Sequence, residues 1–295
     1  MKYLTSAEIA KIWNVSERSV RNYCAAGRIE GAFLSGKSWN IPENADKPVR
    51  ANKRKPDPGT LSEVLKTEKN LKLSGGIYHY IQVSLTYNSN HMEGSRLSEE
   101  QTRLIFETYT IVSDGSIPVN DILETANHFR CVDRILEDIS RPLSERFIKE
   151  LHGMLKAGTS DSRTGWFAVG EYKKLPNTVG GTETTAPEEV HTKMAALLAS
   201  YRAKTEITLD DLLAFHCRFE QIHPFQDGNG RVGRLILFKE CLRFRIIPFI
   251  IDEELKFFYY RGIREWDTER GYLRDTCLAA QDKFRKVLDY YRISY

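Results

Sequence analysis

The sequence has no long hydrophobic run. Its longest apolar stretches are residues 235–238 and 246–251, and Pro248 interrupts the second. Both are far shorter than the roughly 20 residues that a membrane-spanning helix needs. The first eight residues, Met-Lys-Tyr-Leu-Thr-Ser-Ala-Glu, contain no apolar signal core. These absences argue against a membrane-spanning or secreted protein, so we expect a cytoplasmic protein with no membrane partner.

Cysteine is also scarce, with five residues in 295 and no Cys-x-x-Cys spacing. A disulfide framework, a cysteine-ligated zinc site and a dithiol redox motif are therefore not indicated. Free thiols in a reducing compartment are the simple interpretation. The remaining composition, 41% hydrophobic and 28% charged, is that of a globular protein long enough for one large core and a small second domain.

The net charge of +3 conceals an asymmetry along the chain. Residues 1–60 contain 11 Lys or Arg and 6 Asp or Glu, whereas the remainder contains 32 and 34. The basic excess therefore lies in the N-terminal fifth, where an anionic partner such as nucleic acid is most plausible.

A linker is predicted at residues 49–60, because two prolines, a glycine and a basic run leave nothing there for a core. It separates a small domain, residues 1–48, from a large one, residues 61–295. In the small domain, Thr5 and Glu8 form a capping box for a first helix. Ser16 can cap a second helix that extends to about Ala26. Two short strands are expected at 29–34 and 38–41.

The large domain is predicted to be mainly α-helical. Helical apolar spacing occurs at 61–94, 98–111, 120–138, 143–156, 186–202, 209–222, 231–244 and 254–264. One insertion, residues 163–183, is rich in Gly, Thr and Pro and could form a hairpin.

The most informative segment lies between two of these helices and reads His223-Pro-Phe-Gln-Asp-Gly-Asn-Gly-Arg-Val-Gly-Arg234. Pro224 ends the preceding helix. The two glycines let backbone N–H groups turn toward one point at the N-terminus of the next helix, which makes an anion cradle. A histidine suits proton transfer, and Asp227 suits a hard divalent metal. Taken singly, these residues would also fit a structural turn. Together they supply the groups that phosphoryl or nucleotidyl transfer needs.

This segment resembles the Fic-family motif His-x-Phe-x-Asp/Glu-Gly-Asn-Gly-Arg-x-x-Arg at all eight defined positions. The resemblance implies a Fic-type helical bundle with a small β-hairpin flap, and a protein adenylyltransferase that uses ATP and Mg²⁺. His223 would deprotonate a Ser, Thr or Tyr hydroxyl of a protein substrate, and Asp227 would hold Mg²⁺. The residues implied to bind the phosphates are Gly228, Asn229, Gly230, Arg231 and, at the γ-phosphate, Arg234. Phe225 would be a core anchor.

A second Fic pattern, Ser/Thr-x-x-x-Glu-Gly/Asn, occurs at Ser89, Glu93 and Gly94. By this resemblance, a helix near 83–94 would be inhibitory. Glu93 would pair with Arg234 and so occupy the partner of the ATP γ-phosphate. A polar helix face ending at a glycine is the alternative interpretation.

Two further parts of the site follow from the same resemblance. The hairpin would dock the target segment as an added strand, and Asn177, Thr178 and Val179 are the residues expected to do so. A purely structural connector is the alternative. The aromatic run at 257–260 places Tyr259 or Tyr260 at the adenine, although such a stripe also suits a core.

Residues 3–42 resemble the winged helix-turn-helix of excisionase-like and MerR-like proteins. The resemblance implies DNA binding through Arg18, Arg21 and Asn22 on the second helix, with Lys37 and the basic run 53–55 near phosphates. A homodimer would be needed for tight specific binding. Contact with a protein is the alternative.

The expected fold is therefore mainly α, a Fic-type bundle preceded by a winged helix-turn-helix, and the expected function is self-inhibited AMP transfer. Two other functions stay open. One is a DNA-binding regulator whose Fic domain senses nucleotide or modifies itself. The other is removal of AMP from a protein, in which Glu93 would orient a water molecule.

Overall fold

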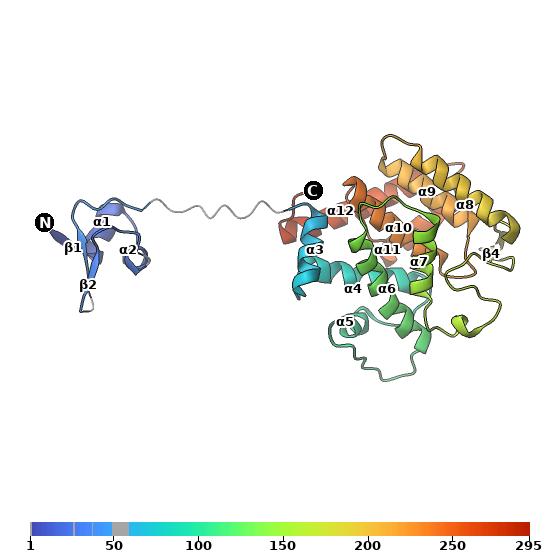
Figure 1. Cartoon of the computed structure of the whole chain (residues 1–295), viewed down its shortest axis with the longest axis horizontal. Helices are drawn as coiled ribbons and strands as arrows, with labels where there is room; N and C mark the ends of the chain where they lie inside the picture. Colours follow the sequence, from blue (N-terminus) through green and yellow to red (C-terminus); the bar gives the residue numbers. More distant parts are fainter. Residues whose placement is uncertain (1, 26, 37, 49–58) are drawn as a thin grey trace. The chain divides into compact units, whose positions relative to one another are not determined.

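The computed structural model describes residues 2–25, 27–36, 38–48 and 59–295. The chain divides into two compact units, residues 1–57 and 58–295. Figure 1 shows each unit, and their relative placement is not determined. The predicted linker at 49–60 and the phosphate contacts predicted at Lys37 and 53–55 lie almost entirely outside the described residues.

The first unit combines two helices with a small antiparallel sheet. Its elements are β1 Tyr3–Thr5, α1 Ser6–Trp13, α2 Glu17–Ala25, β2 Phe33–Ser35 and β3 Ser38–Pro42. The strand order is β1-β3-β2, with Tyr3 opposite Pro42 and Phe33 opposite Asn40. The Thr5–Glu8 capping box starts α1 as expected. The core of this unit consists of Ile9, Ala10, Trp13, Val20, Cys24, Ile29 and Ile41.

The second unit is a helical bundle with a minimal hairpin. Its helices are α3 Leu61–Leu71, α4 Ile77–Met92, α5 Glu99–Thr108, α6 Val119–Glu137, α7 Glu145–Leu155, α8 Pro187–Arg202, α9 Leu209–Ile222, α10 Asn229–Phe244, α11 Glu253–Arg264 and α12 Gly271–Tyr291. A 3₁₀ turn at Asp161–Arg163 and the two-residue strands β4 Thr178–Val179 and β5 Thr182–Glu183 complete it. The prediction of a mainly helical fold is confirmed.

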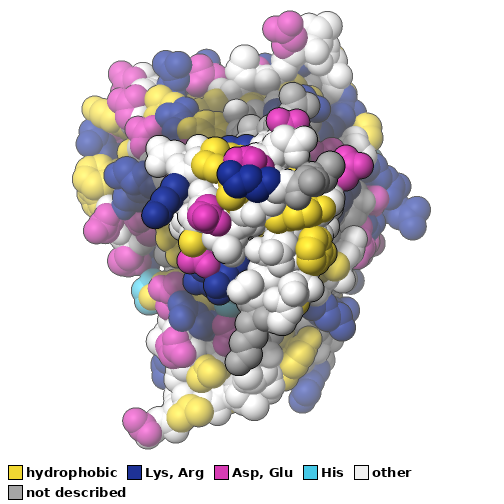
Figure 2. All heavy atoms as spheres, turned by 90° about the vertical axis from the view of Figure 1, so that its left-hand side faces the viewer, with side chains coloured by type: hydrophobic (Ala, Val, Ile, Leu, Met, Phe, Trp, Pro, Cys, Tyr) yellow, Lys and Arg dark blue, Asp and Glu magenta, His cyan; other side chains and the backbone are white. Residues whose placement is uncertain are grey.

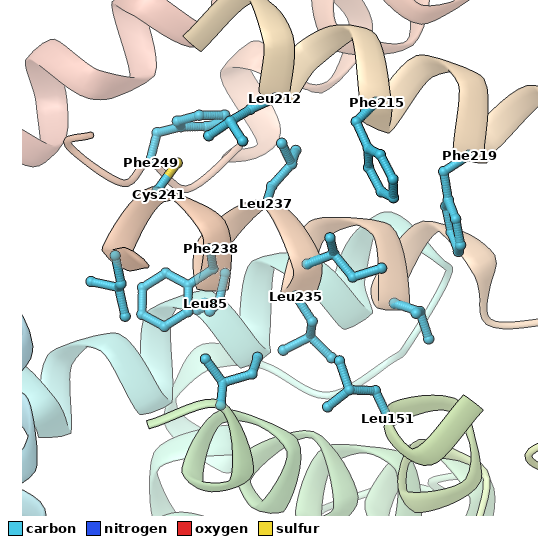
Figure 3. Close-up of a cluster of buried hydrophobic side chains, with 14 of the residues drawn as sticks. Leu85, Leu151, Leu212, Phe215, Phe219, Leu235, Leu237, Phe238, Cys241 and Phe249 are labelled. Carbon is cyan, nitrogen blue, oxygen red and sulfur yellow. The ribbon is translucent and has the colours of Figure 1, made fainter. Parts of the chain in front are cut away.

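Helix α10 lies at the centre of this bundle. All residues from 231 to 242 are buried, as expected for a helix covered on every side. It packs against α4, α6, α7 and α9. Figure 3 shows Leu235, Leu237 and Phe238 of α10 among side chains from α4, α7 and α9. Because α10 is held on all sides, the loop at its N-terminus is fixed relative to these helices.

The structure differs from the sequence predictions at four places. The strand predicted at 29–34 is shorter and lies at Phe33–Ser35. The predicted helix 61–94 breaks at residues 72–76, because Lys72 adopts a left-handed conformation and Gly76 begins α4. Helix α12 lies beyond the last predicted helix, and the buried residues Leu273, Cys277, Ala280, Phe284 and Leu288 form its apolar stripe. Strand β1 was not predicted, because three residues are too few to show an alternating pattern.

The surface and the cysteines match the expectations from composition. In Figure 2, acidic and basic side chains intermingle over the face shown, with hydrophobic side chains in small groups between them. All five cysteines are free and buried. Within the described residues, every helix is too short or too polar to cross a bilayer.

Candidate active site

The loop that joins α9 to α10 carries the eight-position motif. Helix α9 ends at Ile222, and His223 caps it in a left-handed conformation with φ of 50°. Pro224 follows, and it prevents the helix from continuing. Gly228, with φ of 80°, makes the turn that begins α10. Non-glycine side chains seldom adopt this conformation, so the glycine is a requirement of the turn.

His223 is placed to act as a base. Its Nδ1 lies 3.3 Å from the carbonyl oxygen of Glu220, so Nδ1–H donates and the lone pair on Nε2 stays available. The side chain is 16% exposed. Burial lowers the pKa of His223 to about 4, against opposing contributions from the Glu220 carbonyl and Glu93. The imidazole is therefore neutral at neutral pH.

Asn229 and Phe225 hold the loop in shape. The Asn229 side chain accepts a hydrogen bond from the Phe225 N–H and donates one to the Phe225 carbonyl, each at 2.8 Å. Phe225 is fully buried, in agreement with its predicted anchor role. The Asn229 amide, predicted for the phosphates, is thus engaged with the loop itself.

Asp227 keeps a half-exposed carboxylate at the loop. Burial by itself would raise its pKa, but Arg231 and Lys156 outweigh that effect and hold the pKa at about 2. One oxygen, Oδ2, is 2.7 Å from Lys156 Nζ and 3.3 Å from Arg231 Nη2. An ionised carboxylate with half of its side-chain surface exposed fits one contact to Mg²⁺.

The two arginines of the motif point to different acids. Arg231 Nη1 pairs with Glu124 of α6, and its Nη2 pairs with Asp227. Arg234 donates to the Ser89 hydroxyl at 3.0 Å, to the Ser89 carbonyl at 2.8 Å and to Glu93 Oε1 at 2.7 Å. Both arginines are buried, so each depends on its carboxylate for charge compensation.

Glu93 reaches Arg234 from the end of α4. The helix stops at Met92, Glu93 caps it, and Gly94 turns the chain with φ of 91°. Ser89 therefore lies within the helix, and Glu93 follows it. Glu93 Oε1 also lies close to Gly230, where an added Cβ would be 2.3 Å away. The glycine of the loop is thus required for this approach.

The predicted flap is short and is anchored to the loop between α9 and α10. Thr178 and Val179 form β4 and are exposed. The Asn177 side chain is not free for a target: it donates to the carbonyls of Phe225 and Gln226 at 3.0 and 3.4 Å. Buried Lys173 donates to Asn177 and Thr184, which ties both arms of the hairpin together.

The aromatic run on α11 divides between core and site. Tyr259 is buried, and its hydroxyl lies 2.5 Å from His216 Nε2, so it belongs to the core. Tyr260 is partly exposed and donates to the Met92 carbonyl at 3.3 Å, next to Glu93. Of the two tyrosines predicted at the adenine, Tyr260 is the one that borders the site.

Several residues at the site lie outside the eight-position motif. His152 accepts a hydrogen bond from the Gly170 N–H on Nδ1, and its Nε2 faces the Asp227 carbonyl at 3.1 Å. Its ring stacks on Phe225 with centroids 3.9 Å apart. Lys156, Glu124 and Asp161 surround Asp227, and the three acids form a group that could hold a metal. These residues lie far apart in the sequence and belong to no motif, so the sequence did not predict them.

In the first unit, Arg18, Arg21 and Asn22 are exposed on α2, as the helical pattern predicted. Arg21 forms an ion pair with Glu17 one turn earlier, with 2.8 Å between Nη2 and Oε1. The structure therefore brings the three predicted residues onto one exposed stretch of helix.

We expect the free energy of unfolding to fall steeply as pH drops from 6.5 to 4.5. Burial lowers the pKa to about 3 for His128, His152 and His216 and to about 4 for His223. In this window the unfolded chain binds protons that the folded chain excludes. Each histidine then costs about 1.4 kcal/mol per pH unit. Glu220, whose pKa burial raises to about 8, offsets one of them.

Urea unfolding at fixed ionic strength would measure this slope. His191→Gln is the matched control, because His191 is exposed and lies outside the buried set. An unfolding midpoint that stays constant between pH 6.5 and 5 would contradict the prediction.

Comparison with known proteins gives a consistent set of relatives. Residues 142–240 match the Fic/DOC family. The chain is 26% identical over 209 residues to the protein adenylyltransferase Fic of Culex quinquefasciatus, covering 70% of this chain and 40% of that protein. It is 28% identical over 214 residues to that of Drosophila melanogaster, covering 70% and 41%. The chain thus spans about two fifths of the length of these relatives.

Solved structures agree on the fold. A Fic domain containing signaling protein from Bacteroides thetaiotaomicron is 27% identical, with a TM-score of 0.58 over 78% of this chain and 90% of that chain. Fic-1 from C. elegans is 18% identical, with a TM-score of 0.62 over 78% and 71%, and it shows the fold alone. Part of the second unit, residues 142–240, is therefore similar to the Fic/DOC family, and the segment 223–234 lies within that match.

Proposed function

We propose that this chain is a self-inhibited protein adenylyltransferase that moves AMP from Mg-ATP to a Ser, Thr or Tyr hydroxyl of a protein. The observation that carries the proposal is the pairing of a neutral, oriented His223 with a glycine loop at the N-terminus of α10. A base and an anion cradle on one loop suit nucleotidyl transfer, which depends mainly on positioning and charge stabilisation.

The reaction assigns one task to each group. The target hydroxyl gives its proton to His223 Nε2 while its oxygen attacks the α-phosphorus. The bond from the α-phosphorus to the oxygen that bridges to the β-phosphate breaks, and pyrophosphate leaves. The backbone N–H groups at Gly228 and Gly230 would bind phosphate oxygens, and Arg234 would pair with the γ-phosphate. When Mg²⁺ is held by Asp227, it neutralises phosphate charge.

Self-inhibition is part of the proposal. The Arg234 guanidinium holds Glu93 Oε1 at 2.7 Å, and this occupies the donor that the γ-phosphate needs. Because Arg234 is buried, it cannot turn to solvent to hold a second anion. ATP and Glu93 would therefore compete for one cation.

Two versions of ATP labelled with ³²P at either the α- or the γ-position would test the reaction. The Glu93→Gly protein is incubated with each label, Mg²⁺ and cell lysate, and AMP-modified proteins are then identified by mass spectrometry. Label from α-³²P-ATP alone supports AMP transfer. Label from γ-³²P-ATP would overturn it in favour of phosphotransfer, and label from neither, with nucleotide binding intact, would overturn transferase activity.

Removal of AMP is the second candidate, and the position of Glu93 beside the loop favours considering it. Protein labelled by the Glu93→Gly variant would be incubated with the wild-type chain. Release of AMP that requires Glu93 would assign Glu93 to a water molecule rather than to inhibition alone.

We also propose that the first unit binds DNA through α2, supported by the exposed Arg18, Arg21 and Asn22. A gel shift with random and self-promoter DNA tests this. An Arg18→Ala/Asn22→Ala variant that shifts DNA as well as the wild type would leave protein contact as the role of this unit. Since the homodimer was expected only for tight, specific DNA binding, that result would also remove the reason to expect one.

A further inference from the structure

Lys156 stands at the centre of an ionic cluster beside the catalytic loop. Its Nζ lies 2.5 Å from Glu124 Oε1, 2.6 Å from Asp161 Oδ2 and 2.7 Å from Asp227 Oδ2. The side chain is 2% exposed. A buried ammonium needs carboxylate partners, and these three ion pairs compensate its charge.

Four separate segments bring this cluster together. Glu124 comes from α6, Lys156 from the end of α7, Asp161 from the 3₁₀ turn and Asp227 from the loop. Arg231 of α10 adds a second cation through Glu124 and Asp227. The three carboxylates lie close enough together to hold a metal, yet the position among them is taken by the lysine ammonium.

The net charge of the cluster follows from its members. Three carboxylates and two cations leave one net negative charge. A triphosphate must approach this region with its own negative charges, and Asp227 is the group expected to hold its Mg²⁺. Without Lys156 the cluster would have two net negative charges, which would repel a metal-free nucleotide and attract a divalent cation by itself.

We propose that Lys156 is a positioning residue of the nucleotide site. It holds Asp227 by one oxygen and reduces the net negative charge of the cluster from two to one, so that a divalent cation enters with the nucleotide and not alone. This inference rests on the proposed nucleotide-binding function, but its test uses binding alone. A failure of AMP transfer would therefore leave it standing.

The test compares ATP affinity in EDTA with that in excess Mg²⁺, by calorimetry on full-length protein in the Glu93→Gly background. The measured quantity is the dissociation constant of ATP in EDTA divided by that in Mg²⁺. Lys156→Met should increase this ratio at least tenfold, mainly by weakening ATP binding in EDTA. Lys156→Arg keeps the positive charge, so its ratio should stay close to that of the unchanged Lys156. Asp161→Asn removes a negative charge instead, so it should reduce the ratio, about threefold.

Opposite shifts from two changes in one cluster distinguish charge from disturbed packing, which would move both variants in the same direction. Mn²⁺ binding without nucleotide, followed by electron paramagnetic resonance, should appear only in Lys156→Met. Asp114→Asn, in an exposed loop, is the matched control. If Lys156→Met does not fold, the ratio measured for Asp161→Asn alone tests the proposal. Ratios unchanged in the folded variants, or shifted in the same direction, would overturn the proposal.

Discussion

Replacement of Glu93 by Gly is expected to raise self-labelling by AMP at least tenfold. The variant loses the carboxylate that holds Arg234 Nη2 at 2.7 Å. The buried guanidinium then keeps its hydrogen bonds to the Ser89 hydroxyl and carbonyl, and these groups carry no charge. A γ-phosphate supplies the missing negative charge, so ATP binds in its productive position. Labelling with α-³²P-ATP and calorimetric ATP affinity would both measure the change.

The same variant should be less stable without nucleotide. A buried ion pair that loses one partner typically costs 3–5 kcal/mol. Glu93 is 29% exposed, so we expect a smaller loss, about 1–3 kcal/mol after allowance for solvent screening. Saturating ATP should recover a large part of it, because a ligand that binds only the folded state stabilises that state.

Two matched variants separate the effect of the Glu93 charge from the effect of side-chain size and neutral hydrogen bonds. Glu93→Gln keeps the size of the side chain and removes its charge, so it should release part of the inhibition. Ser89→Ala removes only a neutral hydrogen bond to Arg234 and should change labelling less than either. Equal labelling by the wild type and Glu93→Gly would refute inhibition by this pair.

Replacement of His223 by Ala in the Glu93→Gly background is expected to lower AMP transfer at least a hundredfold. General base catalysis commonly contributes that much. Nucleotide affinity should change little, because the phosphate-binding groups on the loop remain. A loss of ATP binding instead of turnover would assign His223 a structural role. His191→Ala is the matched control, since His191 is exposed and distant in sequence from the loop.

The pH profile gives an independent test of the same residue. The base form of His223 is the neutral imidazole, and its pKa is about 4 in the folded chain. The base is therefore present above that pH and is lost as pH falls through it. Single-turnover transfer should stay nearly constant from pH 8 to about 5.5, within the range where the fold persists. A midpoint near 6.5 would indicate an ordinary, solvated histidine.

The local chemistry of the loop follows from its sequence. Pro224 ends α9, Gly228 makes the left-handed turn, and the apolar run after Arg234 makes α10 a buried helix. These are short-range effects of backbone geometry and hydrophobic burial, so spacing alone predicted the helix, the loop and the second helix. Ser89 and Glu93 were predicted from their resemblance to the Fic inhibitory pattern, and their contacts with Arg234 span more than 140 residues.

Other assignments needed the packed structure. Asn177 was predicted to meet a target, but its side chain is bonded to the loop, and Tyr259 faces His216 in the core. Helical periodicity places a residue on a face and cannot say what covers that face. Helix α12 shows the same limit at a larger scale, because it was left out of the predicted helices although its apolar stripe is regular.

The sequence by itself determined the loop between α9 and α10, with its histidine, its carboxylate and the glycines that its turns require, because these depend on neighbours a few residues apart. The pairing of Arg234 with Glu93 was predicted by resemblance, but only the tertiary structure decided the partners of Arg231 and Lys156. Arg231 and Arg234 are three residues apart, yet one pairs with α6 and the other with α4. Lys156 joins the site for the same reason: burial removes solvent as a partner, so a charge must take the carboxylates that the fold brings to it.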